Sequence, residues 1–126
     1  MSEKKHGTPL SEAEIASRLK AGLPQWRHEA GAIARTYRTH GWKGTLMVIN
    51  AVGHVCEAAW HHPEIAADYA SVTVRLNTHS AKGVTDLDFA LAAKIEEVVM
   101  WRPPAGGPLP GTPEDDQRFA YIKYGR

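Results

Sequence analysis

The sequence has a single cysteine and no apolar run long enough to span a bilayer. Cys56 cannot form an internal disulfide on its own, so a reducing, cytoplasmic setting is expected. The N-terminal segment begins with charged residues but lacks the apolar stretch of a secretory signal. Neither sign of charge dominates, with 15 Lys and Arg against 14 Asp and Glu. This balance argues against nucleic acid or an anionic membrane as the main partner, because both select a basic surface.

The composition that is present suits one soluble domain: the 126 residues are 43% apolar and 23% charged. The polar residues 1–9 predict a flexible N-terminus, and residues 10–101 predict the folded domain. Residues 102–126 form a C-terminal extension that is rich in proline and glycine and then becomes aromatic. Its final stretch, RFAYIKY at 118–124, is expected to add to a sheet edge or to dock in a groove.

Three segments have the periodicity of amphipathic helices. The first spans about 11–21, where Ser11 and Glu14 form a capping box. The second spans 41–60 and must end before Pro63, because proline disfavours helical backbone in the preceding residue. The third runs from its N-cap, Thr85, to about 101. The apolar stripes predicted to face the core are Leu46, Ile49, Gly53 and Cys56 in the second helix and Leu87, Leu91, Ile95 and Val98 in the third. The stripe of the second helix is predicted to be widened by Trp42, Ala51, Val55 and Ala58.

The segments between these helices alternate like strands. Residues 24–39 predict a hairpin that turns at 29–31. Residues 69–79 predict a strand with Val72, Val74 and Leu76 on its apolar side. Strands that are separated by helices, each with one polar and one apolar face, predict an α+β fold. In such a fold an antiparallel sheet carries its helices on one side.

Two adjacent histidines, His61 and His62, directly precede Pro63 in the stretch EAAWHHPEI. If the helix continues this far, Glu57 and His61 lie four residues apart on one face, and the carboxylate can accept a hydrogen bond from the imidazole. The side chain of His62 then points about 100° away from that of His61 around the helix axis. Neighbouring histidines on a helix do not readily bind one ion, so no metal site is predicted. Two interpretations stay open: an acid–base site, or a helix end at which histidine is mildly favoured.

Two further residues bear on this choice. His79 follows Asn77 and Thr78 at the end of a predicted strand, and it matters for chemistry only if it meets the histidine pair in space. Asp88 lies in the first turn of the third helix, where an acidic side chain suits the helix dipole. A second role for Asp88, orienting a histidine, is a hypothesis that does not follow from the sequence pattern by itself.

Together, Glu57, His61-His62-Pro63, Tyr69, His79 and Asp88, spaced over 32 residues, resemble the signature of the pterin-4a-carbinolamine dehydratases. The likeness extends over roughly residues 9–99. It implies a four-stranded antiparallel sheet with three helices packed on one face, in subunits that assemble as homodimers or tetramers. The implied activity is dehydration of 4a-hydroxytetrahydropterin to quinonoid dihydropterin by histidine acid–base catalysis. Pterin is then the substrate, and no metal or organic cofactor is implied.

The resemblance also implies roles for individual residues. His61, His62 and His79 would be catalytic, with His61 and His79 as the acid–base pair and His62 holding the substrate. Glu57 would tune His61 across one turn of the helix. The residues implied to bind the pterin, directly or from behind the histidines, are Glu57, Pro63, Asn77, Thr78, Ser80 and Asp88.

Four residues depart from the family pattern. The family usually has phenylalanines in the regions where this chain has Tyr37, Thr39 and Trp42. It commonly has a small polar or acidic residue where this chain has Trp60, and a bulky ring there is expected to narrow the pocket.

The extension 102–126 and the AAWHHPEI form resemble a carboxysome-associated branch of the family that is linked to Rubisco assembly. This likeness implies an alternative in a different functional class: a dehydratase-like protein without catalysis that acts as a Rubisco assembly factor, with Rubisco subunits as partners. The extension would then be a docking peptide. It is equally open that the extension packs on its own or a sister subunit and stabilises the oligomer.

Overall fold

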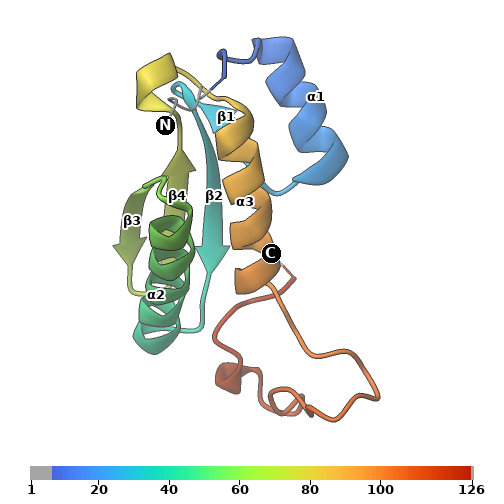
Figure 1. The fold of residues 1–126 in the computed structure, drawn as a ribbon. Helices are drawn as coiled ribbons and strands as arrows, with labels where there is room; N and C mark the ends of the chain where they lie inside the picture. The colour runs from blue at the N-terminus through green and yellow to red at the C-terminus, as the bar shows by residue number, and fades with distance from the viewer. Residues whose placement is uncertain (1–6, 126) are drawn as a thin grey trace.

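The computed structural model describes residues 7–125, so residues 1–6 of the expected flexible N-terminus lie outside the described part. The helices are α1 (Glu12–Gly22), α2 (Trp42–Ala59) and α3 (Asp86–Val99), with two short 3-10 turns, η1 (His79–Ala81) and η2 (Gln117–Phe119). The strands are β1 (Arg27–Glu29), β2 (Ala32–Arg38), β3 (Glu64–Asp68) and β4 (Ser71–Leu76) (Figure 1). Within 7–125, no helix is long and apolar enough to cross a membrane.

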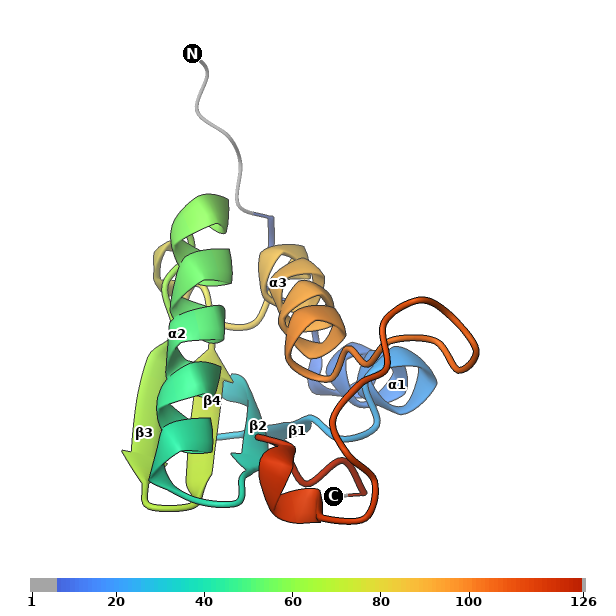
Figure 2. The ribbon, with the colours of Figure 1, turned by 90° about the horizontal axis from the view of Figure 1, so that it is seen from below.

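The four strands form one antiparallel sheet in the order β1-β2-β4-β3. The three helices lie on one side of this sheet, where α2 and α3 pack against each other and α1 lies near β1 (Figures 1 and 2). Val72, Val74 and Leu76 of β4 are fully buried on this side, as their alternation predicts. The predicted α+β architecture, with helices on one face of an antiparallel sheet, is thereby confirmed.

The helix starts lie where the capping residues predict them. The Oγ of Ser11 accepts a hydrogen bond from the backbone N–H of Glu14, and the Glu14 carboxylate accepts one from the N–H of Ser11, both at 3.1 Å. Thr85 and Asp88 form the same capping box at the start of α3. Each box satisfies backbone donors that have no partner within the helix, which sets the first residue of the helix.

The buried faces of α2 and α3 are rotated from the predicted stripes. Cys56, Leu91 and Ile95 are buried as expected, but Leu46, Gly53, Leu87 and Val98 are exposed and Ile49 is only half-buried. Both helices carry apolar residues around most of their circumference, so periodicity alone fits more than one face. Val55, which is predicted to widen the stripe of α2, is buried. The residues that complete the buried faces are Val48 and Val52 in α2 and Phe89, Ala92 and Val99 in α3.

The strands occur as two hairpins. β1 and β2 turn at Ala30 and Gly31, whose φ angles of 50° and 78° are typical of a two-residue turn that follows the twist of its strands. The strand predicted at 69–79 is shorter, Ser71–Leu76, and it pairs with β3. Residue patterning did not single out β3, because all of its residues are exposed and they show no apolar alternation.

A polar network joins α3 to the sheet. Arg35, buried on the helix-facing side of β2, donates from Nε and Nη2 to the two carboxylate oxygens of Glu96 at 3.0 and 3.1 Å. The Tyr37 hydroxyl and the Trp26 indole donate to the same carboxylate at 2.8 and 3.0 Å. Burial by itself would raise the pKa of Glu96, but the hydrogen bonds from Arg35 and Tyr37 outweigh it and hold that pKa below its usual value.

The C-terminal extension returns to its own domain. Ile122 is 1% exposed and forms an antiparallel bridge with Thr39, just beyond the end of β2. The N–H of Lys123 donates to the carbonyl of Arg38 at 2.8 Å. The hydroxyl of Tyr121 donates to the carbonyl of Val99 at 2.7 Å. The end of the extension therefore pairs with the sheet, which is one of the two placements predicted for it.

A glycine in α2 allows this close approach. A Cβ on Gly44 would lie only 2.5 Å from the carbonyl oxygen of Tyr121.

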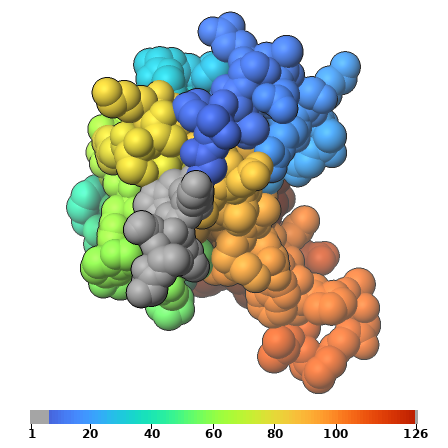
Figure 3. Space-filling view, turned by 45° about the horizontal axis from the view of Figure 1, so that its top comes forward, coloured from blue at the N-terminus to red at the C-terminus, as the bar shows by residue number. Residues whose placement is uncertain are grey.

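The middle of the extension is less covered: Leu109 and Phe119 are exposed, and the segment that follows α3 stands out from the body of the molecule (orange in Figure 3). The extension thus combines a docked end with a protruding loop.

Candidate active site

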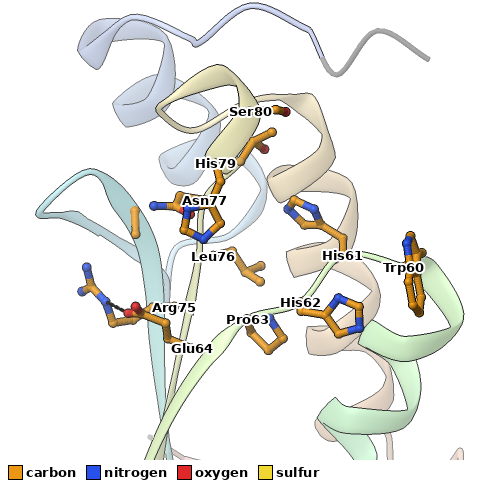
Figure 4. Close-up of a pocket in the computed structure, with 12 residues that line it drawn as sticks. Trp60, His61, His62, Pro63, Glu64, Arg75, Leu76, Asn77, His79 and Ser80 are labelled. Carbon is orange, nitrogen blue, oxygen red and sulfur yellow. Dashed lines mark hydrogen bonds and ion pairs between the residues drawn. The ribbon is translucent and has the colours of Figure 1, made fainter. Parts of the chain in front are cut away.

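A cavity of about 400 Å³ opens where the end of α2 meets the end of β4. Figure 4 shows its lining side chains, most of which come from the segment after α2 and from the end of β4 with η1. The histidine pair and His79, whose meeting the sequence left open, share this cavity. The predicted site residues that line it are His61, His62, Pro63, Asn77, Thr78, His79 and Ser80.

The end of α2 brings the histidine pair to the cavity. Trp60 has left-handed backbone (φ 58°, ψ 46°). Its N–H donates to the carbonyl of Glu57 at 3.2 Å, and the N–H of His61 donates to the carbonyl of Cys56 at 3.1 Å. These two bonds form a Schellman motif, which ends the helix and turns the chain away from its axis. His61 and His62 therefore lie beyond the helix.

The end of β4 supplies the opposite wall. Thr78 and Gly83 form an isolated antiparallel bridge, with the N–H of Thr78 donating to the carbonyl of Gly83 at 2.8 Å. The four residues between them loop outward as η1 and Lys82, which has a φ of 61°. This loop presents His79 at the surface of the cavity (Figure 4).

Asp88 lies behind the cavity and holds His61. The side chain of Asp88 is 0% exposed, and its Oδ1 lies 2.7 Å from Nε2 of His61. Its Oδ2 accepts hydrogen bonds from the Thr78 hydroxyl at 2.8 Å and from the backbone N–H of Thr85 at 2.9 Å. The Thr78 hydroxyl has one proton and donates it to Asp88, so the Thr85 hydroxyl, 2.8 Å away, donates to Thr78. Every neighbour of Asp88 in this network is therefore a donor.

This network selects the proton arrangement of His61. A carboxylate only accepts hydrogen bonds, so the nitrogen of His61 that faces Asp88 carries the proton. Nδ1 is then the nitrogen of the neutral ring that has a lone pair available. A buried carboxylate behind an imidazole is a common way to set both the tautomer and the orientation of a histidine. The orienting role considered for Asp88 is thus consistent with its position.

Glu57 contacts a different histidine from the one predicted. Its Oε1 accepts a hydrogen bond from Nε2 of His62 at 2.9 Å, whereas the partner of His61 is Asp88. The predicted contact between Glu57 and His61 assumed helical backbone through His61. The left-handed turn at Trp60 ends the helix earlier, so that contact is wrong.

The cavity also has a charged end that sequence reasoning missed. Arg75 and Glu64 line it, and their side chains lie 3.4 Å apart at Nε and Oε1 (Figure 4). Arg75 also donates from Nη1 to Glu29 at 2.9 Å. The sequence contained a signal for Arg75. It precedes the predicted site residue Asn77 by two positions, so the two side chains are expected on the same face of the strand.

Trp60 lies at one end of the cavity and is 74% exposed. The bulky ring expected to narrow the pocket is therefore turned largely toward solvent. Its ring centroid is 4.9 Å from that of His62, with the two planes at 81°. Within residues 7–125, no three His, Cys, Asp or Glu side chains are grouped so that they could hold a metal ion.

Comparison with known sequences links the chain to one family. A family model described as pterin 4 alpha carbinolamine dehydratase matches residues 8–98. A Chloroflexus aurantiacus protein is 44% identical over 90 residues, which cover 71% of this chain and 96% of that protein. An Aquifex aeolicus protein is 39% identical over 90 residues, which cover 71% of this chain and 90% of that protein. Both relatives carry pterin-4-alpha-carbinolamine dehydratase as a provisional name.

Two solved structures have the same fold. One, described as a transcriptional coactivator/pterin dehydratase from Brucella melitensis, superposes with a TM-score of 0.67 and 31% identity. The match covers 73% of this chain and 99% of that chain. The other is described as a pterin dehydratase-like protein that is a RuBisCO assembly factor in the alpha-carboxysome. It has a TM-score of 0.51, 17% identity, and coverage of 60% of this chain and 89% of that chain, so it shows the fold alone.

Proposed function

Because the chain belongs to the pterin 4a-carbinolamine dehydratase family, we propose that it removes water from a 4a-hydroxytetrahydropterin by histidine acid–base catalysis. The observation that carries this proposal is the cavity shared by His61, His62 and His79, in which His61 is anchored on the buried Asp88. The product would be quinonoid dihydropterin.

The reaction needs one acid and one base. The bond between C4a and the hydroxyl oxygen breaks, and an acid donates a proton so that the oxygen leaves as water. A base takes the proton from N5, and a double bond forms between N5 and C4a. Imidazole suits both tasks, because its unperturbed pKa lies near neutral pH. The proton taken by one histidine balances the proton given by the other.

The positions of the side chains support the proposed roles. His61 carries its Nε2 proton toward Asp88, so Nδ1 is available to take the proton from N5. His79, exposed on η1, would protonate the leaving hydroxyl, and His62 would hold the pterin. The Thr78 hydroxyl is already committed to Asp88, so Thr78 would support His61 through that carboxylate. The other proposed pterin contacts come from Pro63, Asn77 and Ser80.

Stopped-flow measurement of 4a-hydroxytetrahydropterin dehydration tests this proposal. We expect a rate above the spontaneous one for the wild type, and loss of that excess in His61→Ala and in His79→Ala. His54 provides the matched control, because it is an exposed histidine of α2 that does not line the cavity. His54→Ala should keep the wild-type rate. A wild-type protein no faster than buffer would refute the dehydratase proposal.

A second candidate function is favoured by the extension. Its residues 102–126 lie outside the family match, and the exposed Leu109 and Phe119 leave apolar surface uncovered. Uncovered apolar side chains on a polar loop suit a docking peptide. We therefore propose, as the alternative, that the extension binds Rubisco subunits and that the protein acts as an assembly factor associated with the alpha-carboxysome.

Co-expression with Rubisco subunits separates the two functions. The alternative predicts a higher yield of assembled Rubisco, which falls for Leu109→Asp with Phe119→Asp and is unaffected by His61→Ala. The two aspartate changes lie on exposed residues, so the fold should tolerate them. An unchanged Rubisco yield with and without the wild-type protein would rule out this assembly role.

We also propose that the chain forms homodimers or tetramers. Trp42, Leu46 and Met47 leave an apolar surface on α2 uncovered in a single subunit. Light scattering should give the mass of a dimer or tetramer, and Leu46→Asp should shift the mass toward that of one subunit. A single-subunit mass at every concentration would argue against this assembly.

A further inference from the structure

Trp60 occupies a backbone conformation that normally selects another residue. It follows α2 with φ 58° and ψ 46°, in the left-handed position of the Schellman motif. Glycine or asparagine usually occupies this position, because a side chain with a bulky ring disfavours left-handed backbone. Within 7–125 the other non-glycine residues with positive φ are Ala30 and Lys82. A large aromatic residue in such a strained position suggests that its side chain has a functional role.

Among residues 7–125, the ring that packs against the indole of Trp60 is that of His62. The rings lie 4.9 Å apart between centroids and are nearly perpendicular, at 81°. Figure 4 shows the indole beside the imidazole of His62, on the side away from Arg75. Such an edge-to-face arrangement is favourable for two aromatic rings. The contact therefore links the unusual backbone of Trp60 to a residue of the cavity.

The orientation of the His62 ring depends on this contact, because the other restraint on His62 is weaker than the one that holds His61. The side chains of His62 and Glu57 are 52% and 68% exposed, and an exposed ion pair or hydrogen bond restrains its partners only weakly. His61, in contrast, is held by the fully buried Asp88. Without the indole, the imidazole of His62 would keep the solvent-exposed Glu57 as its one partner in the described part of the chain, and its rotation would be little restricted.

We propose that Trp60 is a positioning residue that holds the imidazole of His62 against the mouth of the cavity, so that the ring is ready to receive a flat pterin. The left-handed backbone turns the indole to the outer side of His62, and Glu57 fixes the ring nitrogen from a second direction. The inference rests on the proposed function for its substrate class. It predicts an effect on substrate binding and not on the proton transfers, because the indole packs on the ring of His62, whereas the imidazole of His61 is held by Asp88.

Three substitutions test this role. Trp60→Phe keeps an aromatic edge-to-face partner, whereas Trp60→Asn and Trp60→Gly keep or improve the left-handed backbone and remove the ring. Trp101→Asn is the matched control, because Trp101 is an exposed tryptophan that does not line the cavity. Thermal unfolding of Trp60→Gly should occur at or above the wild-type temperature, since glycine removes the backbone strain.

The decisive readouts are kinetic and spectroscopic. For Trp60→Asn, we expect KM to rise about threefold to tenfold, the loss that corresponds to one aromatic ring pair, with kcat changed less than about twofold. Trp60→Phe should restore most of the KM, and Trp101→Asn should leave it unchanged. A fall in kcat with an unchanged KM would overturn the proposal, because it would place Trp60 in the chemical step.

Nuclear magnetic resonance tests the positioning without any turnover. In the ligand-free protein, the ring protons of His62 should lose their ring-current shift in Trp60→Asn and regain part of it in Trp60→Phe, while those of His61 stay in place. Binding of 7,8-dihydropterin, measured by calorimetry, should weaken in parallel. An inactive wild type that still shows these changes would refute dehydration and support the positioning of His62. Unchanged His62 resonances in Trp60→Asn would overturn the inference in either case.

Discussion

Nε2 of His61 lies 2.7 Å from Oδ1 of Asp88, a carboxylate that is itself completely buried. The two residues come from the segment after α2 and from the first turn of α3, 27 positions apart. Asp88 thus serves two parts of the structure at once. One carboxylate oxygen caps the helix through the N–H of Thr85, and the other holds the imidazole.

The substitution Asp88→Asn should preserve the helix cap and disturb the contact with His61. The amide can still accept the hydrogen bond from Thr85, but it offers its NH₂ group to His61 and favours the wrong tautomer. We expect kcat for dehydration to fall about 10²-fold or more, the contribution typical of a positioned acid or base. Asp86→Asn is the control, since Asp86 lies exposed in the same helical turn. A kcat for Asp88→Asn within twofold of wild type would contradict this role.

Glu96 should make the fold sensitive to acid. Its pKa is held below the ordinary 4.5 because the hydrogen bonds from Arg35 and Tyr37 outweigh the effect of burial. A carboxyl whose pKa is lower in the folded state stabilises the fold above its unfolded pKa, and this stabilisation is lost as the pH falls through the folded pKa. The free energy of unfolding, measured in urea, should therefore decline below about pH 4.5.

Glu96→Gln should remove this part of the pH dependence. It should also lower the free energy of unfolding at neutral pH by about 3 kcal/mol, because the buried Arg35 then loses the charged carboxylate that accepts from its Nε and Nη2. Glu97→Gln provides the control, since Glu97 is exposed and pairs only with Lys94 within the described residues. Equal acid sensitivity in the Glu96→Gln protein and the wild type would show that other carboxyls carry the effect.

Local signals in the sequence predicted most of the fold. Ser11 and Thr85 cap helices by contacts with residues three positions away, and Val74 marks the apolar side of β4 by alternation. The pairing of His61 with Asp88 could not be predicted in this way, because it depends on the path of the chain through two hairpin strands and η1. The prediction for Glu57 failed for a local reason: no helix signal indicated that Trp60 would adopt left-handed backbone.

The docked end of the extension should contribute to stability. Ile122→Ala removes a side chain that is 1% exposed and should lower the free energy of unfolding by about 2–4 kcal/mol. Phe119→Ala changes a neighbouring side chain that is 63% exposed and should alter it by less than about 0.5 kcal/mol. Urea unfolding of both variants gives the comparison. Similar small effects would mean that the extension detaches readily from the domain.

Cys56 should be unreactive in the folded protein. Burial raises the pKa of its thiol from 9.0 to about 11, which lowers the thiolate fraction at mildly alkaline pH about 100-fold. The Sγ is also covered by its neighbours, since the residue is only 1% exposed. Ellman's reagent should therefore react slowly with the native protein and at once in concentrated guanidinium chloride. Rapid reaction before denaturation would indicate that the end of α2 opens.

A partner that binds the end of the extension is expected to change the melting temperature of this protein in an unusual direction. Ile122 and Lys123 cannot remain paired with β2 while a second protein holds them in another geometry. Such a partner would bind the folded protein only after undocking, which weakens its affinity, but it would bind the extension of the unfolded chain without that cost. Ligands of the native state raise a melting temperature. A partner that removes the end of the extension would lower it, whereas one that recognises only the protruding loop would leave it unchanged.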